Sequence, residues 1–113
     1  MIKHYTLENF DLHENALEAQ LFLPADLVYF DGHFDEMPIL PGIAQTHWAI
    51  ELAKKHLNIQ GEFSSVDNIK FTRIIEPEQS VNLKVTYDSV KNFLEFSYVS
   101  ERGPHSSGKI RFS

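Results

Sequence analysis

Residues 80–90, SVNLKVTYDSV, alternate cleanly between apolar and polar side chains. In an extended chain Val81, Leu83, Val85 and Tyr87 would share one face, and the polar residues between them would share the other. This period of two is typical of a strand in an antiparallel sheet that has one buried and one solvated face. The chain is therefore expected to build an antiparallel sheet and to cover one side of it.

Several other segments have the residue types and flanking breakers of strands. The segment ALEAQLFLP stops at Pro24, and its length and this proline favour a strand over a helix. We expect residues 91–92 to form a two-residue turn and residues 102–108 to form a loop or hairpin. The predicted strands are residues 1–10, 16–24, 63–75, 80–90, 93–101 and 109–113.

Residues 42–57 form the one segment with a helical composition and no proline after its start. At about 100° per residue its first three turns are apolar almost all round, as in a buried helix. The cationic residues near its end suit the partial negative charge of a helix C-terminus, and Gly61 lies just beyond the stop. We therefore expect one helix, buried by the rest of the chain.

The predicted order is two strands, one helix and four strands. An α+β fold, in which an antiparallel sheet wraps round one long central helix, accounts for this order. An α+β sandwich, with the helix lying on one face of a sheet, is the alternative. The 113 residues suit a single domain, residues 1–113, and leave little room for a second one.

Composition argues against several classes of function. A net charge of −6 disfavours general nucleic-acid binding, and the absence of cysteine excludes disulfides, thiolate nucleophiles and zinc–thiolate sites. The six histidines have no zinc-motif spacing, so we expect no metal site. No apolar run approaches the roughly 20 residues that cross a bilayer, and the first ten residues lack a signal-peptide core. We therefore expect a cytoplasmic protein without a membrane span.

Residues 29–42, YFDGHFDEMPILPG, combine a titratable group with residues that restrict the backbone. Pro41 fixes the chain before the predicted helix, and Gly42 permits close approach of another group. The free N–H groups of the helix N-terminus could polarise a carbonyl oxygen as an oxyanion hole does. Histidine has an ordinary pKa of about 6.5, so His33 could accept a proton there. A packed structural histidine and an ordinary helix start are the alternatives.

Residues 32–42 resemble the G-H-F-x-x-x-P-[IV]-x-P-G signature of the β-hydroxyacyl-acyl-carrier-protein dehydratases, which have the hotdog fold. Residues 66–85 resemble that family's D-x-x-[RK]-F-x-R-x-V-x-P-G-D segment, but Glu78-Gln79 stand where Gly-Asp is usual. The resemblance covers roughly residues 15–112 and implies a single hotdog domain, assembled as dimers with the active site at the interface. The Q-x-x-W-A start of the helix is similar to dehydratase-like proteins of aryl polyene lipid pathways.

The resemblance implies dehydration of a 3-hydroxyacyl thioester to the trans-2-enoyl thioester, with no cofactor. His33 would be the catalytic histidine, and the backbone N–H of Gly42 would hold the thioester carbonyl. The family's second catalytic residue is Glu or Asp fourteen positions after the histidine, and here that position is His47. An imidazolium can donate a proton as a carboxylic acid can, and Glu51 lies four residues later on the same helix side. We therefore predict His47 of the partner subunit, or water bound to it, as the acid, with a buried, merely hydrogen-bonded histidine as the alternative.

Further residues are expected around this site. The predicted substrate-binding residues, lining an apolar tunnel between subunits, are Phe30, Phe34, Pro41 and Trp48. The three aromatic residues could equally be plain core. The family's carrier protein is acidic, so Lys70 and Arg73 are predicted to dock it, whereas Lys54 and Lys55 are interpreted as solvated surface. The expected partners are an acyl carrier protein and a second copy of the chain, as a homodimer or a higher assembly of dimers.

Two other functions stay open at this point. A hotdog thioesterase would need a carboxylate or activated water near the thioester, and Glu51 or Asp31 are the candidates. A non-catalytic acyl-binding partner subunit would dimerise but turn over no substrate, having lost the usual acidic residue at position 47.

Overall fold

The computed structural model describes residues 4–30 and 39–113. Within these ranges the chain forms six strands, one α-helix and one short 3₁₀ helix, in the order that the sequence predicts. The strands are β1 (Thr6–Leu12), β2 (Ala16–Phe22), β3 (Phe63–Phe71), β4 (Ser80–Asp88), β5 (Phe93–Ser100) and β6 (Gly103–Phe112). The helices are η1 (Val28–Phe30) and α1 (Gly42–His56).

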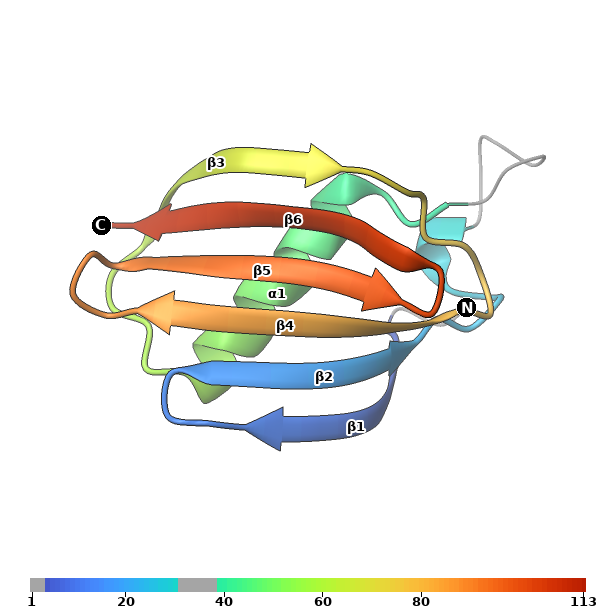
Figure 1. The fold of residues 1–113 in the computed structure, drawn as a ribbon, viewed down its shortest axis with the longest axis horizontal. Helices are drawn as coiled ribbons and strands as arrows, with labels where there is room; N and C mark the ends of the chain where they lie inside the picture. Colours follow the sequence, from blue (N-terminus) through green and yellow to red (C-terminus); the bar gives the residue numbers. More distant parts are fainter. Residues whose placement is uncertain (1–3, 31–38) are drawn as a thin grey trace.

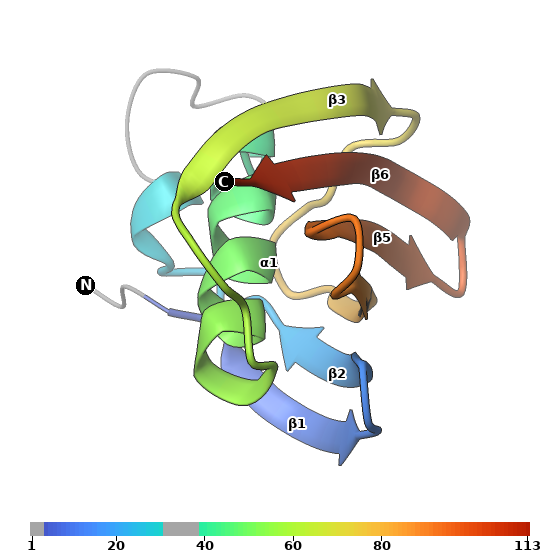
Figure 2. The same cartoon turned by 90° about the vertical axis from the view of Figure 1, so that its left-hand side faces the viewer.

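All six strands join one antiparallel sheet in the order β1-β2-β4-β5-β6-β3. Figure 1 shows the strands stacked in this order with α1 crossing behind them, and Figure 2 shows the sheet curving round α1. The predicted arrangement of one helix wrapped by an antiparallel sheet, the hotdog fold, is therefore confirmed. β3 follows α1 in sequence but pairs with β6, which leaves β3 and β1 as the two edges of the sheet.

The core lies between the concave face of the sheet and one face of α1. In β4 the alternation predicted from the sequence is confirmed, since Val81, Leu83 and Val85 are fully buried and Tyr87 is 6% exposed. The buried residues of α1 are Ala44, Gln45, Trp48, Ala49, Leu52 and Ala53. The hydrophobic effect on these two facing surfaces is what holds the helix against the sheet.

The prediction that α1 is buried all round is wrong for the single chain. The sheet covers only one side of the helix, and the opposite side keeps apolar surface in solvent, with Ile43 80% exposed. α1 has 15 residues, and within the described ranges no helix combines the length and apolarity needed to span a bilayer.

The last strand is longer than predicted. Residues 102–108, expected as a loop or hairpin, mostly belong to β6, because Gly103 adopts a φ of 107° and pairs with Ser100 at once. The polar side chains of this stretch are tolerated in the core since they find partners there: His105 bonds Ser100, and Ser106 bonds Gln45.

Two strand ends also differ from the prediction. The β4–β5 loop has four residues rather than two, because Asp88 pairs with Phe93 and its carboxylate accepts the N–H groups of Val90 and Lys91. β3 ends at Phe71 rather than at residue 75, and a register shift at residues 67–70 includes Asn68 at a φ of 50°.

Candidate active site

An apolar groove of about 500 Å³ runs between the exposed face of α1 and the edge strand β3. Its wall on the β3 side exposes large hydrophobic side chains, including Phe63 (49%) and Phe71 (54%). Soluble proteins rarely leave such a surface uncovered, so the groove is a candidate for a ligand or a partner chain. The lining residues are Gly42, Ile43, Thr46, His47, Ile50, Phe63, Val66, Ile69 and Phe71.

The N-terminus of α1 lies at the head of this groove. Pro41 is the N-cap, at φ −62° and ψ 150°, and it has no side chain that could accept a helix N–H. The N–H groups of Ala44 and Gln45 both donate to the Pro41 carbonyl, whereas the Gly42 N–H has no acceptor among residues 4–30 and 39–113. The geometry thus offers an N–H donor and the positive end of a helix dipole at the predicted oxyanion position.

Sequence reasoning did not select Phe71 as a site residue, although it matched the second family segment. The ring lies against the Cα of Gly42, so closely that a Cβ at Gly42 would come within 2.7 Å of Phe71 Cε1. The signal in the sequence was a set of four large apolar residues in β3 that do not keep a period of two. Register shifts in the strand let all four of them line the groove: Phe63, Val66, Ile69 and Phe71.

His47 lies on the groove wall one turn of α1 after Ile43. Its side chain is 63% exposed, and its Nε2 lies 3.6 Å from an oxygen of Glu51, which is 42% exposed. The alternative of a buried histidine is therefore wrong for the single chain. The predicted neighbourhood of His47 and Glu51 is confirmed, while the catalytic role of His47 stays a prediction.

Glu51 also influences Tyr5 on its other side. The Tyr5 ring packs edge-on against Trp48 with a centroid distance of 4.9 Å. Burial raises the pKa of the Tyr5 phenol, and the Glu51 carboxylate raises this pKa further. The carboxylate of Glu51 thus lies near His47 of the groove and also acts on a half-buried phenol.

The other predicted substrate-binding residues lie in different surroundings. Trp48 is 1% exposed and packs in the core, which is the alternative that the sequence left open for it. Phe30 is half-buried in η1 and packs against the core, and Pro41 is half-buried at the head of α1. His33 and Phe34, like the thioesterase candidate Asp31, lie outside the described residues.

The predicted docking residues are exposed near the head of the groove. Lys70 lies in β3, and Arg73 follows the end of that strand. Arg73 helps to line a second, smaller cavity of about 190 Å³ that shares Gly42 and Phe71 with the groove. Lys54 and Lys55 are exposed in the last turn of α1, as expected for solvated surface.

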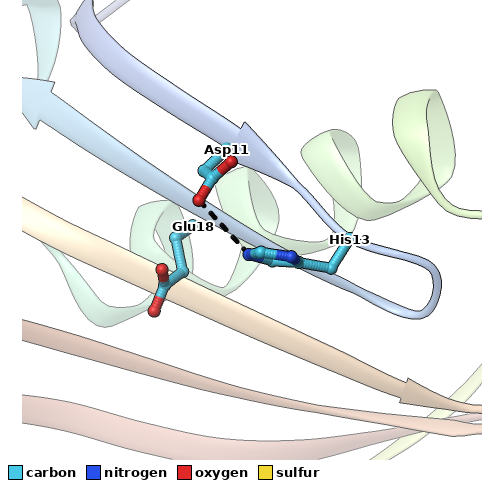
Figure 3. A group of neighbouring side chains, drawn as sticks. All are labelled: Asp11, His13 and Glu18. Carbon is cyan, nitrogen blue, oxygen red and sulfur yellow. Dashed lines mark ion pairs between the residues drawn. The ribbon is translucent and has the colours of Figure 1, made fainter.

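One group of potential metal ligands lies apart from the groove. Asp11, His13 and Glu18 gather on the β1–β2 hairpin with ligand atoms within 4.8 Å of one another (Figure 3), although no two of them have zinc-motif spacing. His13 Nε2 lies 3.3 Å from an Asp11 oxygen, and all three residues are exposed. An ion pair on a solvated hairpin accounts for this geometry.

Comparison with known proteins confirms the resemblance over most of the chain. The family model described as ApeI-like, ApeI dehydratase, matches residues 9–109. The 3-hydroxyacyl-[acyl-carrier-protein] dehydratase FabZ of Burkholderia mallei (strain SAVP1) is 30% identical over 97 residues, a match that takes in 76% of this chain. The chain spans only 63% of the length of that relative.

Two solved structures superpose closely on the chain. The dehydratase heterocomplex ApeI:P from Xenorhabdus doucetiae gives a TM-score of 0.89 at 31% identity and covers 95% of this chain and 96% of that one. An uncharacterized protein from Erwinia carotovora subsp. atroseptica gives 0.82 at 32% identity and covers 100% of this chain and 97% of that one.

Proposed function

The chain belongs to the ApeI-like dehydratase family, and we propose that it converts a 3-hydroxyacyl thioester on an acyl carrier protein to the trans-2-enoyl thioester. The observation that carries this proposal is the uncapped N-terminus of α1 at the head of an apolar groove, with His47 on the groove wall. If the thioester carbonyl binds at Gly42, the acyl chain of the substrate would lie along the groove. We propose an aryl or polyenoic acyl chain as the preferred substrate. The support for this choice is the similarity of the helix start to proteins of aryl polyene pathways, which is weaker than the resemblance to the dehydratase family.

The proposed reaction is an elimination of water across C2 and C3. His33 takes the C2 proton, and the electron pair moves toward the thioester oxygen, where the Gly42 N–H stabilises the developing negative charge. The C3–O bond then breaks, the C2=C3 double bond forms, and the leaving hydroxyl takes a proton to depart as water. No net oxidation occurs, so the proposal requires no cofactor.

His47 is the proposed proton donor for the leaving hydroxyl. Its Nε2 lies 3.6 Å from an oxygen of the Glu51 carboxylate, which is a partner for the imidazole one turn later on the same side of the helix. The pair takes the place of the single carboxylic acid of the related dehydratases. This assignment needs the imidazole to face a substrate in the groove, where its exposed position leaves it accessible.

A second chain would complete the site. The exposed apolar residues along α1 and β3 support a partner that covers the groove, either another copy or a related hotdog subunit. Among the described residues the edge strand β3 pairs with β6 alone, and its other edge is suited to such a contact. The acyl carrier protein, being acidic, is proposed to dock at Lys70 and Arg73, close to the head of the groove.

A second candidate function is a non-catalytic partner subunit of a heteromeric dehydratase. The observation that favours it is His47 at the position where the family resemblance implies Glu or Asp. The similar Xenorhabdus doucetiae structure is itself a dehydratase heterocomplex. On this proposal the chain binds the acyl group, and another subunit supplies the carboxylic acid.

Mass spectrometry of a 3-hydroxyacyl carrier protein incubated with the chain tests these proposals. We expect loss of water from the acyl group with wild type, loss of this activity in His33→Ala, and full activity in His13→Ala. The last variant is the matched control, because His13 is an exposed histidine on the β1–β2 hairpin. Release of free thiol from a substrate without a 3-hydroxyl would support a thioesterase instead. The partner-subunit function would be supported if the isolated chain shows no turnover and if adding a second hotdog subunit produces turnover.

A further inference from the structure

Gln45 is an amide buried at the place where the first turns of α1 meet the sheet. Its side chain is 3% exposed, among the buried residues Ala44, Trp48 and Ala49. A buried polar group is unfavourable unless it is hydrogen-bonded, and an apolar side chain would fill the same volume without that requirement. The bonds that Gln45 makes therefore indicate what the amide does.

Gln45 connects three separate segments. Its Nε2 donates to the carbonyl oxygen of Leu40 at 3.1 Å, and its Oε1 accepts the Ser106 hydroxyl of β6 at 2.6 Å. Its backbone carbonyl accepts the Tyr98 hydroxyl of β5, also at 2.6 Å. The side chain thus ties the segment before the helix to β6, while the Tyr98 bond holds the same helix residue against β5.

Leu40 is held from both sides as a result. Its N–H donates to the Ile75 carbonyl at 2.8 Å, its carbonyl accepts the Gln45 amide, and its side chain is 2% exposed. The next residue is Pro41, whose ring fixes φ near its observed −62°. The Pro41–Gly42 peptide, which carries the Gly42 N–H, is therefore held on one side by Leu40 and on the other by the Ala44 and Gln45 N–H groups that donate to the Pro41 carbonyl.

We propose that Gln45 is a positioning residue that fixes the Leu40–Pro41 corner and so aims the Gly42 N–H into the groove. The inference rests on the proposed function, in which this N–H stabilises the charge that develops on the thioester oxygen. An aligned donor acts mainly in the transition state, so a loose corner lowers kcat more than it changes KM. A purely structural Gln45 would change stability without this selectivity.

The test compares Gln45→Met, Ser106→Ala and Tyr87→Phe. Methionine has a similar length and removes both side-chain bonds of Gln45, whereas Ser106→Ala removes one of them and changes the volume little. Tyr87→Phe is the matched control, because it removes a hydroxyl bonded to Asn92 on a residue that is only 6% exposed, in the β4–β5 hairpin. Each variant is measured for thermal unfolding, for steady-state kinetics on a 3-hydroxyacyl carrier protein, and for the heteronuclear NOE of backbone amides.

We expect Gln45→Met to lower kcat at least tenfold with KM within about twofold, and to lower the NOE of the Leu40, Gly42 and Ile43 amides. Ser106→Ala should change kcat and these NOE values in the same direction but by less. This variant provides the test if Gln45→Met does not fold. Tyr87→Phe should lose stability and keep both kcat and these amide signals. Two results would overturn the inference. One is that Tyr87→Phe lowers kcat as much as the two site variants do. The other is that the NOE values of the Leu40, Gly42 and Ile43 amides stay unchanged in both site variants.

The amide measurement requires no turnover, which separates the two proposals. A wild type that forms no enoyl product counts against the proposed function alone. In that case the NOE comparison between the site variants and Tyr87→Phe still decides whether Gln45 holds the corner.

Discussion

The ring of Phe71 lies against the Cα of Gly42, joining the last residue of β3 to the first residue of α1. A Cβ built at Gly42 would come within 2.7 Å of Phe71 Cε1, far inside van der Waals contact. Only glycine lets the aromatic ring of the sheet edge and the helix N-terminus meet this closely. Both residues line the groove, so the contact lies at the place where the proposed oxyanion donor is found.

Gly42→Ala is expected to lower kcat/KM at least about tenfold, because the added methyl group displaces Phe71 and alters the approach to the Gly42 N–H. The fold should survive, since Phe71 is 54% exposed and its ring can rotate outward. Steady-state kinetics with thermal unfolding measures both effects. In a Phe71→Ala background the same substitution should reduce kcat/KM by less, which a double-mutant cycle detects.

Gly108→Ala is the matched control for that substitution. Its Cβ would come within 2.7 Å of Phe96 Cε2, but Phe96 is 3% exposed and has no room to move. Overpacking of this kind costs about 1–3 kcal/mol of stability. Gly42→Ala should therefore be the more stable variant and the less active one. The reverse order in kcat/KM would count against the assignment of Gly42.

His47→Glu is expected to lower activity, even though it restores the residue type of the related dehydratases. A carboxylate at position 47 would face Glu51 one turn later, and like charges four residues apart on a helix repel. Adding Glu51→Gln to His47→Glu should recover part of the loss in kcat. An increase in activity from His47→Glu alone would support the partner-subunit function instead.

Glu78→Gly is expected to stabilise the chain by about 0.5–1 kcal/mol. A left-handed conformation is unfavourable for a residue with a Cβ, and this cost exceeds the entropy that glycine adds to the unfolded chain. Glu78 is exposed and adopts a φ of 60°, at the position where the family segment has glycine. Urea unfolding measures the change. Glu101→Gly, at an exposed turn residue that does not have a positive φ, is the control and should not stabilise the chain.

Stability should fall at alkaline pH because of Tyr98. Burial raises the pKa of its phenol well above the ordinary value, with a smaller contribution from Tyr5. Below the ordinary pKa of about 10 both the folded and unfolded states keep the proton, so the free energy of unfolding does not change through this group. Above about pH 10 the unfolded state loses the proton first, and stability declines until the pH exceeds the folded-state pKa.

Urea unfolding at a series of pH values from 8 to about 11 measures this decline. The chain contains no cysteine, so thiol ionisation does not contribute. Tyr98→Phe should show a shallower decline than wild type. A decline of the same slope in both proteins would show that other groups cause it.

The elements were readable from the sequence because their signals are local. The alternation at Val81, Leu83 and Val85 identified the buried face of β4, and the unbroken helical stretch from Gly42 identified α1. The error at the start of β6 arose where a distant partner decided the outcome. Residues 103–108 looked like a loop because their polar and small residues gave no strand pattern, yet Gln45 and Phe96 supply the surroundings that those residues fit.

The sequence by itself determined which face of β4 is apolar, where the helix begins, and that the helix starts at a Pro–Gly corner. Only the tertiary structure decided that β3 pairs with β6, that Phe71 therefore meets Gly42, and that Gln45 reaches Ser106 from 61 residues away. Periodicity constrains the side of a strand or helix that turns inward, because that depends on neighbouring residues. Contacts between elements depend on strand order and register, which emerge only when all the apolar faces are buried together.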